Sequence, residues 1–459
     1  MKIADFLINC IKERCAALES EVCRLLVTHS TSPGATSLLI LIEDTNRQIL
    51  DKIETIAKST TIRNTLTNAQ LEQSLNRFAK LLPTLHELLS FLEGTERKGS
   101  FFPFAHPLRR LMRKHIEECE VVFASRPELN YSFEEVSSPI RSILNAASLN
   151  DICNIFPKYF LIISFPQAEA ENILLHCIFA HEIGHAVYQK ENLVDGILGR
   201  VKVSKEQIKN LSSEALMSHR GSRGLNKTAI QIREQITEEI NKSAESWADE
   251  LTSDAIAVCL FGPAYLFAFI HLIISFQLMD NCSDTHPSPR LRLRLICQMM
   301  DLLKYTRHFP GPLRKYYGPW KREASRPVQV DNPILKVVSR SFEPVLSAII
   351  QQTLKTVKPQ YTDSTYAADI KTLPQLIIAG ILPVEVVKDH KKRTMQTQSV
   401  ISILNAGWLV NLTALDEFAK SRHLKTADPF KVKRKLQEEI SKALELQEIT
   451  TMWKELHNA

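Results

Sequence analysis

The segment LLHCIFAHEIGHAVYQK, residues 174–190, places histidines and a glutamate in an otherwise apolar run. His181 and His185 are four residues apart, so on a helix they share a face and can point ring nitrogens at one ion. Glu182 lies on the flank of that face, within reach of a water bound to the ion. This HExxH spacing is typical of zinc hydrolases. His176, five residues before His181, faces elsewhere, and we expect a core or surface histidine there.

A hydrolytic zinc site takes three protein ligands and keeps one position open, so a third ligand is needed. The helix predicted over residues 228–261 carries two ExxxD pairs, Glu245/Asp249 and Glu250/Asp254. The pairs are five residues apart and lie on different faces, so we expect only one pair to serve. Glu250 and Asp254 border the apolar run AIAVCLF, where unpaired carboxylates are costly. We expect Glu250 as the third ligand, with Glu245 as the alternative, and Asp254 as the partner of a histidine ligand.

A third polar element is THPSPRLRLRL, residues 285–295, in which His286 precedes a proline. Three arginines alternate with leucines after it: Arg290, Arg292 and Arg294. On a helix Arg290 and Arg294 share a side and Arg292 faces another. Near zinc, a histidine or an arginine would stabilise the oxyanion formed when hydroxide attacks a carbonyl. The spacing fits a basic surface turn equally well.

The ordered set of HExxH, ExxxD and an HP dipeptide with an arginine six residues beyond its histidine resembles the gluzincin metallopeptidases. The segments EIGHAV, WADELTSDAIAVCLFGPAY and THPSPRLRL look closest to the CaaX-prenyl-endopeptidase and heat-shock-protease type. They also look like uncharacterised soluble bacterial proteins with gluzincin motifs. The resemblance covers residues 157–300, and the transmembrane helices of the membrane-bound relatives have no counterpart in the sequence.

The resemblance implies a role for each motif residue. The strand-like segment YFLIISF, residues 159–165, would be the edge strand along which an extended peptide lies. The implied site residues are the zinc ligands His181, His185 and Glu250, the general base Glu182, the outer partner Asp254, and the oxyanion or substrate-positioning pair His286 and Arg292.

The elements that must position these residues are predicted to be mostly helices, because the chain has only 13 glycines and long amphipathic segments. We expect a mainly α (α+β) fold, in which a zincin-like catalytic domain with a small sheet and an active-site helix is flanked by helical domains. A Pro166 stop should end the strand over 159–165. The predicted helices span 3–27, 42–58, 67–93, 107–118, about 167–190, 228–261, from about 290, and from Asp428-Pro429 onward.

A chain of 459 residues is too long for one ordinary core, so several domains are expected. The predicted division has four parts: an N-terminal helical domain over 1–125, a zincin-like metallopeptidase domain over 126–308, a proline-rich linker or wrapping loop over 309–333, and a C-terminal helical domain over 334–459.

Composition indicates a soluble, cytoplasmic protein. Apolar residues make up 44% and charged residues 24%, with a net charge of +6. The nine cysteines form no CxxC pair, which favours a reducing compartment. The pattern of the first residues predicts an amphipathic helix and not a signal peptide. Residues 254–279 are apolar but interrupted, and we expect two buried helices meeting at Gly262-Pro263 instead of a membrane span.

We therefore expect a zinc-dependent metallopeptidase, a hydrolase acting on a protein or peptide substrate, with Glu182 as general base on zinc-bound water. The alternative is a regulatory or scaffold protein with a structural zinc site, whose helical flanks bind partners. A third hypothesis is nucleic-acid binding through 304–327, where basic residues alternate with aromatic ones. A proline-rich loop wrapped over its own domain is the favoured interpretation of that stretch. We expect neither nucleic acid nor a membrane as a partner.

Overall fold

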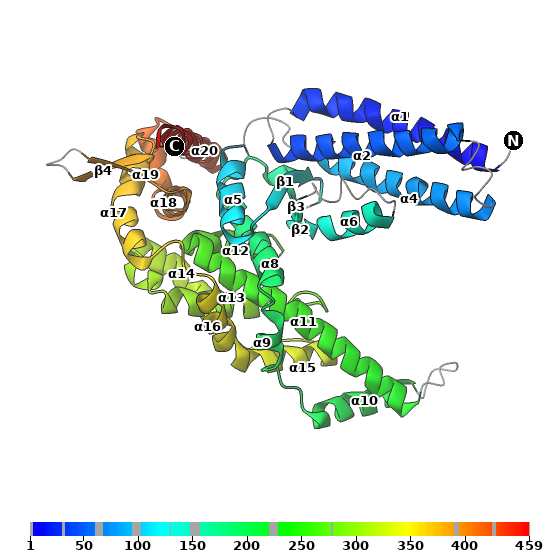
Figure 1. Cartoon of the computed structure of the whole chain (residues 1–459). Helices are drawn as coiled ribbons and strands as arrows, with labels where there is room; N and C mark the ends of the chain where they lie inside the picture. Colours follow the sequence, from blue (N-terminus) through cyan, green and yellow to red (C-terminus); the bar gives the residue numbers. More distant parts are fainter. Residues whose placement is uncertain are drawn as a thin grey trace. The chain divides into compact units, whose positions relative to one another are not determined.

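The protein is mostly helical, with one small mixed sheet and a β-hairpin in the described part of the chain (Figure 1). This confirms the mainly α fold with a small sheet. The computed structural model describes residues 3–29, 33–59, 68–93, 102–128, 130–146, 157–219, 228–276, 279–389, 394–424 and 428–458. Contacts divide the chain into two compact units, Met1–Ala170 and Glu171–Ala459.

The first unit is built on three long helices that lie side by side (Figure 1, blue). Their apolar residues recur every three or four positions, as an amphipathic helix requires. Leu18, Ile42 and Leu75 are among the buried residues of the shared core. The helices of this unit are α1 Ile3–His29, α2 Pro33–Lys58, α4 Asn68–Glu93, α5 Phe102–His115 and α6 Ser137–Ala146.

The sheet of the first unit has the order β1-β3-β2. Strand β1 (Cys119–Arg126) runs parallel to β3 (Tyr159–Pro166), and β2 (Ser132–Glu135) runs antiparallel to it. Residues 161–164 of β3 are paired on both sides. The expectation that this segment is an edge strand open to a peptide is therefore wrong. Its continuous apolar sequence agrees with the burial of both its faces, but its central place comes from pairing with β1 on one side and β2 on the other.

The second unit is centred on the long helix α11 (Ala229–Phe261), against which α8 (Phe179–Lys190) packs. Thr228 and Gln231 form a capping box at its start, and Gly262, with a positive φ of 58°, ends it before α12 (Pro263–Phe276). These boundaries confirm the predicted helix over 228–261. The remaining elements are α9 Val194–Leu198, α10 Lys205–His219, α13 Pro289–Leu302, α14 Gly311–Ala324, α15 Pro333–Phe342, α16 Leu346–Thr356, α17 Asp363–Ala379, β4 Glu385–Asp389, β5 Thr394–Thr397, α18 Val400–Thr413, α19 Leu415–Ser421 and α20 Pro429–Asn458.

The helix that carries the HExxH motif begins later than predicted. It starts at Phe179, and residues 167–169 and 175–178 form separate 3₁₀ turns. The side chain of Asn172 accepts a hydrogen bond from the backbone N–H of Leu175 at 3.4 Å. The same N–H also donates to the backbone carbonyl of Asn172 at 2.9 Å, a bond of the 3₁₀ type.

The stretch expected to be a linker or wrapping loop, 309–333, is largely the helix α14. Pro312 stands in the first turn of α14, where a backbone N–H has no helical partner to lose. Within α14, Tyr317 is buried. Nearby, Arg307 pairs with Asp363 and Lys321 with Asp301. Some basic and aromatic groups of this stretch therefore make contacts within the protein.

The C-terminal helices belong to the same compact unit as α8 and α11. Trp408 on α18 donates from Nε1 to the carbonyl of Leu174 at 3.0 Å, and Gln437 on α20 accepts from the backbone N–H of the same residue at 3.1 Å. Both bonds brace the chain just before the HExxH helix. Residues 334–459 are thus grouped with the motif helices and strand β3 with the first unit, and the division into four parts stays a prediction.

Residues 254–276 form the end of α11 and the helix α12, with a break at Gly262, as the sequence predicted, and residues 277–278 of the predicted segment lie outside the described residues. In the described residues, no helix combines the length and the apolar character that crossing a membrane requires. The last helix, α20, begins at Pro429, and the carboxylate of Asp428 accepts from the backbone N–H of Lys431 at 3.1 Å. That cap was also predicted.

Candidate metal centre

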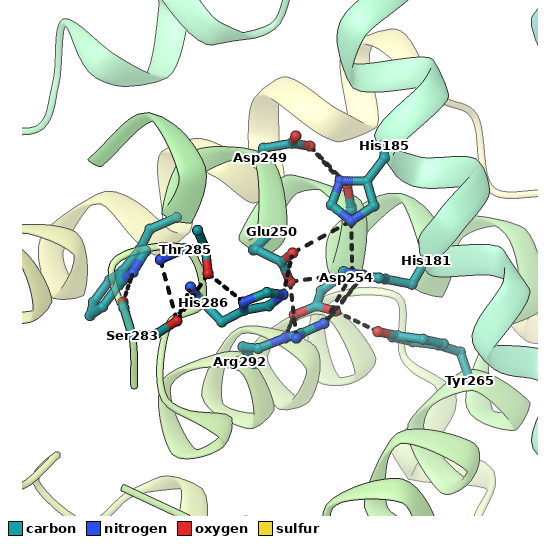
Figure 2. A network of polar contacts seen from close by, with 12 residues as sticks. His181, His185, Asp249, Glu250, Asp254, Tyr265, Ser283, Thr285, His286 and Arg292 are labelled. Atoms are coloured by element: carbon teal, nitrogen blue, oxygen red, sulfur yellow. Dashed lines mark hydrogen bonds and ion pairs between the residues drawn. The ribbon is translucent and has the colours of Figure 1, made fainter. Parts of the chain in front are cut away.

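Helices α8 and α11 bring His181, His185 and Glu250 together (Figure 2). One ligand atom from each of the three residues lies within 4.8 Å of the other two, and the group is suited to hold a metal ion. Glu245, the alternative third ligand, is exposed and is not part of this group. Of the two carboxylates considered for this role, the structure therefore places Glu250 beside the histidines.

The three side chains converge on one point. His181 Nε2 lies 3.1 Å from His185 Nε2. The carboxylate of Glu250 reaches both rings, with Oε2 at 3.3 Å from His181 Nε2 and Oε1 at 3.5 Å from His185 Nε2. All three groups are largely removed from water, His181 and Glu250 more completely than His185.

An aspartate of α11 contacts the Nδ1 atom of each histidine ring. Asp254 Oδ1 lies 3.0 Å from His181 Nδ1, as expected for the outer partner of a ligand. Asp249 Oδ1 lies 2.8 Å from His185 Nδ1. Each of the two ExxxD pairs therefore places an aspartate beside a histidine, contrary to the expectation that only one pair serves.

This arrangement fits a metal ion on chemical grounds. With hydrogens on both Nδ1 atoms, bonded to aspartates, the two Nε2 lone pairs face each other beside a carboxylate. These three donor atoms lie close enough together to share one cation. The Oε2 atom of Glu250 is buried and makes no contact with hydrogen-bond geometry, although the Nη1 atom of Arg292 lies 3.0 Å away. Two imidazoles and one carboxylate are a donor set that divalent metals accept.

Arg292 faces the site from α13. Its Nε and Nη2 atoms each donate to the carboxylate of Asp254 at 2.8 Å, and its guanidinium lies over the ring of Phe269. Tyr265 donates its hydroxyl to the same aspartate. Arg290 pairs with Asp280 and Glu323 instead, and Arg294 with Glu343, so the predicted separation of Arg292 from its two neighbours on the helix is confirmed.

His286 stands at the open side of the group. Its Nε2 lies 3.3 Å from Glu250 Oε1, and its side chain is 59% exposed, against 8% for Glu250. Figure 2 shows the ring between Thr285 and Glu250. The site therefore reaches solvent beside His286. His176, in contrast, is buried with its ring stacked on Phe179, and is not in the metal-binding group, as expected.

Burial and neighbouring charges shift the pKa values of four side chains in the site. Burial raises the pKa of Glu182 above its usual value, despite the neighbouring imidazoles. Burial and Arg292 act to lower the pKa of His181, but Glu250 and Asp254 outweigh them and raise it to about 10. Burial would raise the pKa of Glu250, yet Arg292 and His181 hold it well below its usual range. For Asp254 the same opposition, with Arg292 prevailing, lowers the pKa to about 2. Both of these carboxylates are therefore ionised and attract cations.

The closeness of the two ligand helices depends on a glycine inside the motif. A Cβ atom at Gly184 would lie 2.6 Å from the Cα of Ser253 on α11, far inside van der Waals contact. Ser253 also contacts the site, with its Oγ 3.2 Å from His185 Nδ1. Gly184 thus allows α8 and α11 to approach closely enough for residues of both to surround one point.

No protein-family model, curated protein or solved structure matches the chain. The structure shows a group of two histidines and a glutamate, suited to a metal, in a mostly helical protein. The gluzincin resemblance rests on the motif residues themselves.

Proposed function

We propose that the protein is a zinc-dependent metallopeptidase that hydrolyses peptide bonds in a protein or peptide substrate. The observation that carries the proposal is the convergence of His181, His185 and Glu250, with the outer nitrogen of each ring held by an aspartate. The adjacent Glu182 and the gluzincin-like order of the motifs add to it.

His181, His185 and Glu250 would hold the zinc. Three protein ligands are what hydrolytic zinc sites use, with the fourth position left for water or substrate. When bound, zinc lowers the pKa of a water molecule and polarises a carbonyl group. Asp249 and Asp254 fix the ring orientations and keep the hydrogens on the Nδ1 atoms.

Glu182 is proposed as the general base. It accepts a proton from the attacking water and returns that proton to the nitrogen of the leaving amine as the peptide bond breaks. Its burial, which raises its pKa, suits a group that must both take up and release a proton near neutral pH.

His286 and Arg292 are assigned different roles. His286 is largely exposed beside the metal group, so it can donate a hydrogen bond to the substrate oxygen as negative charge develops there. Arg292 is largely removed from water, with 14% of its side chain exposed, and is bonded to two carboxylates. We assign it to holding Glu250 and Asp254 in place, and thereby the ligand geometry.

The alternative is a scaffold protein with a structural zinc site. Structural zinc sites are almost always closed by four protein ligands. Over the residues that the structure describes, the metal-binding group has three. This difference favours catalysis.

The test combines metal analysis with peptide cleavage. The purified protein should contain one zinc per chain and cut members of a broad peptide library. Glu182→Gln should keep zinc and lose turnover by roughly 10²- to 10⁴-fold. Glu250→Gln should lose zinc, whereas Glu245→Gln, on the exposed side of the same helix, is the matched control and should change neither property.

Each outcome decides between the hypotheses. Full activity in Glu182→Gln removes this residue from the mechanism. Bound zinc without cleavage of any peptide supports the scaffold alternative. Absence of zinc from the wild-type protein, with no uptake on titration, refutes both.

A further inference from the structure

His286 is carried by a tight turn that is tied to the ligand helix. The Ser283 backbone N–H donates to the carbonyl of His286 at 2.9 Å, which closes the turn. Trp247, one helical turn before Glu250 on α11, donates from Nε1 to the carbonyl of Ser283 at 2.9 Å. The turn therefore holds His286 at a fixed position beside Glu250.

Inside the turn, two hydroxyl groups lead to the outer nitrogen of the His286 ring. Ser283 Oγ lies 3.0 Å from Thr285 Oγ1, and Thr285 Oγ1 lies 2.8 Å from His286 Nδ1 (Figure 2). Ser283 Oγ also accepts from the backbone N–H groups of Thr285 at 3.3 Å and His286 at 3.0 Å. With its acceptor positions used, the Ser283 hydroxyl has its hydrogen left to donate to Thr285.

The direction of these bonds follows from the far end of the ring. His286 Nε2 faces the Oε1 atom of Glu250, an ionised carboxylate oxygen, at 3.3 Å. A lone pair on Nε2 would repel that oxygen, so Nε2 carries the hydrogen. In a neutral ring Nδ1 is then an acceptor, and the Thr285 hydroxyl must donate to it. The chain runs from Ser283 to Thr285 to Nδ1.

We propose that Thr285, aligned by Ser283, is a positioning residue that fixes the tautomer of His286 with its hydrogen on Nε2, the atom that donates to the substrate oxygen. This inference rests on the proposed hydrolysis for its purpose, but the tautomer itself does not. Without the hydroxyl, Nδ1 would compete for the hydrogen, and the fraction of rings able to donate from Nε2 would fall.

The experiment uses full-length, zinc-loaded protein labelled with ¹⁵N-histidine. Long-range ¹H–¹⁵N spectra distinguish the two tautomers, and His286→Gln identifies the signals of this ring. The wild type and Thr285→Ser should show the Nε2–H form. Thr285→Val, which has the same shape without the hydroxyl, should show a mixture or the Nδ1–H form. An unchanged Nε2–H spectrum in Thr285→Val overturns the proposal.

Kinetics give the second readout. In Thr285→Val, kcat should fall about three- to tenfold, the effect of one ordinary hydrogen bond at an exposed site. KM should stay within about twofold, and Thr285→Ser should restore kcat. A tautomer that changes without any change in kcat also overturns the positioning role. If the wild type cleaves no peptide at all, the proposed function fails, while the spectra still decide the tautomer.

Discussion

Replacing Gly184 by alanine tests whether the close approach of α8 and α11 holds the metal group together. A Cβ atom at this position would lie 2.6 Å from Ser253 Cα and 2.7 Å from the Ser253 carbonyl oxygen. Carbon atoms in contact are normally about 3.5–4.0 Å apart. Because the obstacle is backbone, no side-chain rotation relieves it, and the two helices must separate by about 1 Å.

The expected cost has two parts. Overpacking a core by one methyl group destabilises a protein by about 1–3 kcal/mol. The separation also acts on the ligands, because His185 follows Gly184 directly and Glu250 precedes Ser253 by one helical turn. Zinc tolerates deviations of only about 0.2 Å in its ligand distances. We expect the zinc Kd to rise by at least the roughly 10- to 100-fold that follows loss of an outer-sphere partner.

The assay is competition for zinc against a chromophoric chelator, together with unfolding followed by tryptophan fluorescence. All four tryptophans lie in the second unit, so the fluorescence reports on the unit that holds the site. Gly318→Ala is the matched control, since a Cβ there would meet only the end of the Arg322 side chain at 3.6 Å. Gly184→Ala binding zinc as tightly as Gly318→Ala would refute the spacing argument.

Two further predictions concern ionisable side chains of the second unit. Asp254→Asn keeps the shape of a fully buried carboxylate but leaves Arg292 with Glu250 as its remaining charged partner. Urea unfolding should show this unit destabilised by about 3–5 kcal/mol. A loss below about 1 kcal/mol would count against a role of this ion pair in stability. His271, whose pKa is lowered to about 4 by burial and by Lys433, stays neutral in the folded protein while the unfolded chain takes up a proton below about pH 6.5. Its contribution is therefore present above pH 6.5 and lost as the pH falls towards 4, by about 1–3 kcal/mol after allowance for partial exposure. His271→Phe should remove that part of the acid sensitivity, and equal losses between pH 7 and pH 5 in variant and wild type would contradict the reasoning.

Local signals predicted the elements that bear the site. The extent of α11 follows from Thr228 at its start and Gly262 at its end, because caps act through bonds within one turn. The convergence of His181 and His185 follows from helical spacing alone. The burial of Glu250 in preference to Glu245 follows from the apolar run that begins beside it.

Contacts between segments far apart in the sequence could not be predicted from the sequence. The segment over 159–165 was predicted as a strand, but its place at the centre of the sheet depends on its pairing with β1 and β2. The integration of the C-terminal helices with the site similarly depends on bonds such as that from Trp408 to Leu174, 234 residues apart. Neither periodicity nor composition encodes such contacts.

The contact of Asp249 with His185 was not predicted, and the geometry of the two helices explains why. Two carboxylates five residues apart cannot both face one partner, but the partner helix offers two rings. His181 and His185 are separated by about 6 Å along α8, and Asp249 and Asp254 by about 7.5 Å along α11. Because His185 meets the earlier aspartate and His181 the later one, the helices run antiparallel, and Glu250 lies between the two contacts. The sequence DExxxD, residues 249–254, with Glu250 as the ligand between its two aspartates, is thus a spacing that matches an antiparallel HExxH helix.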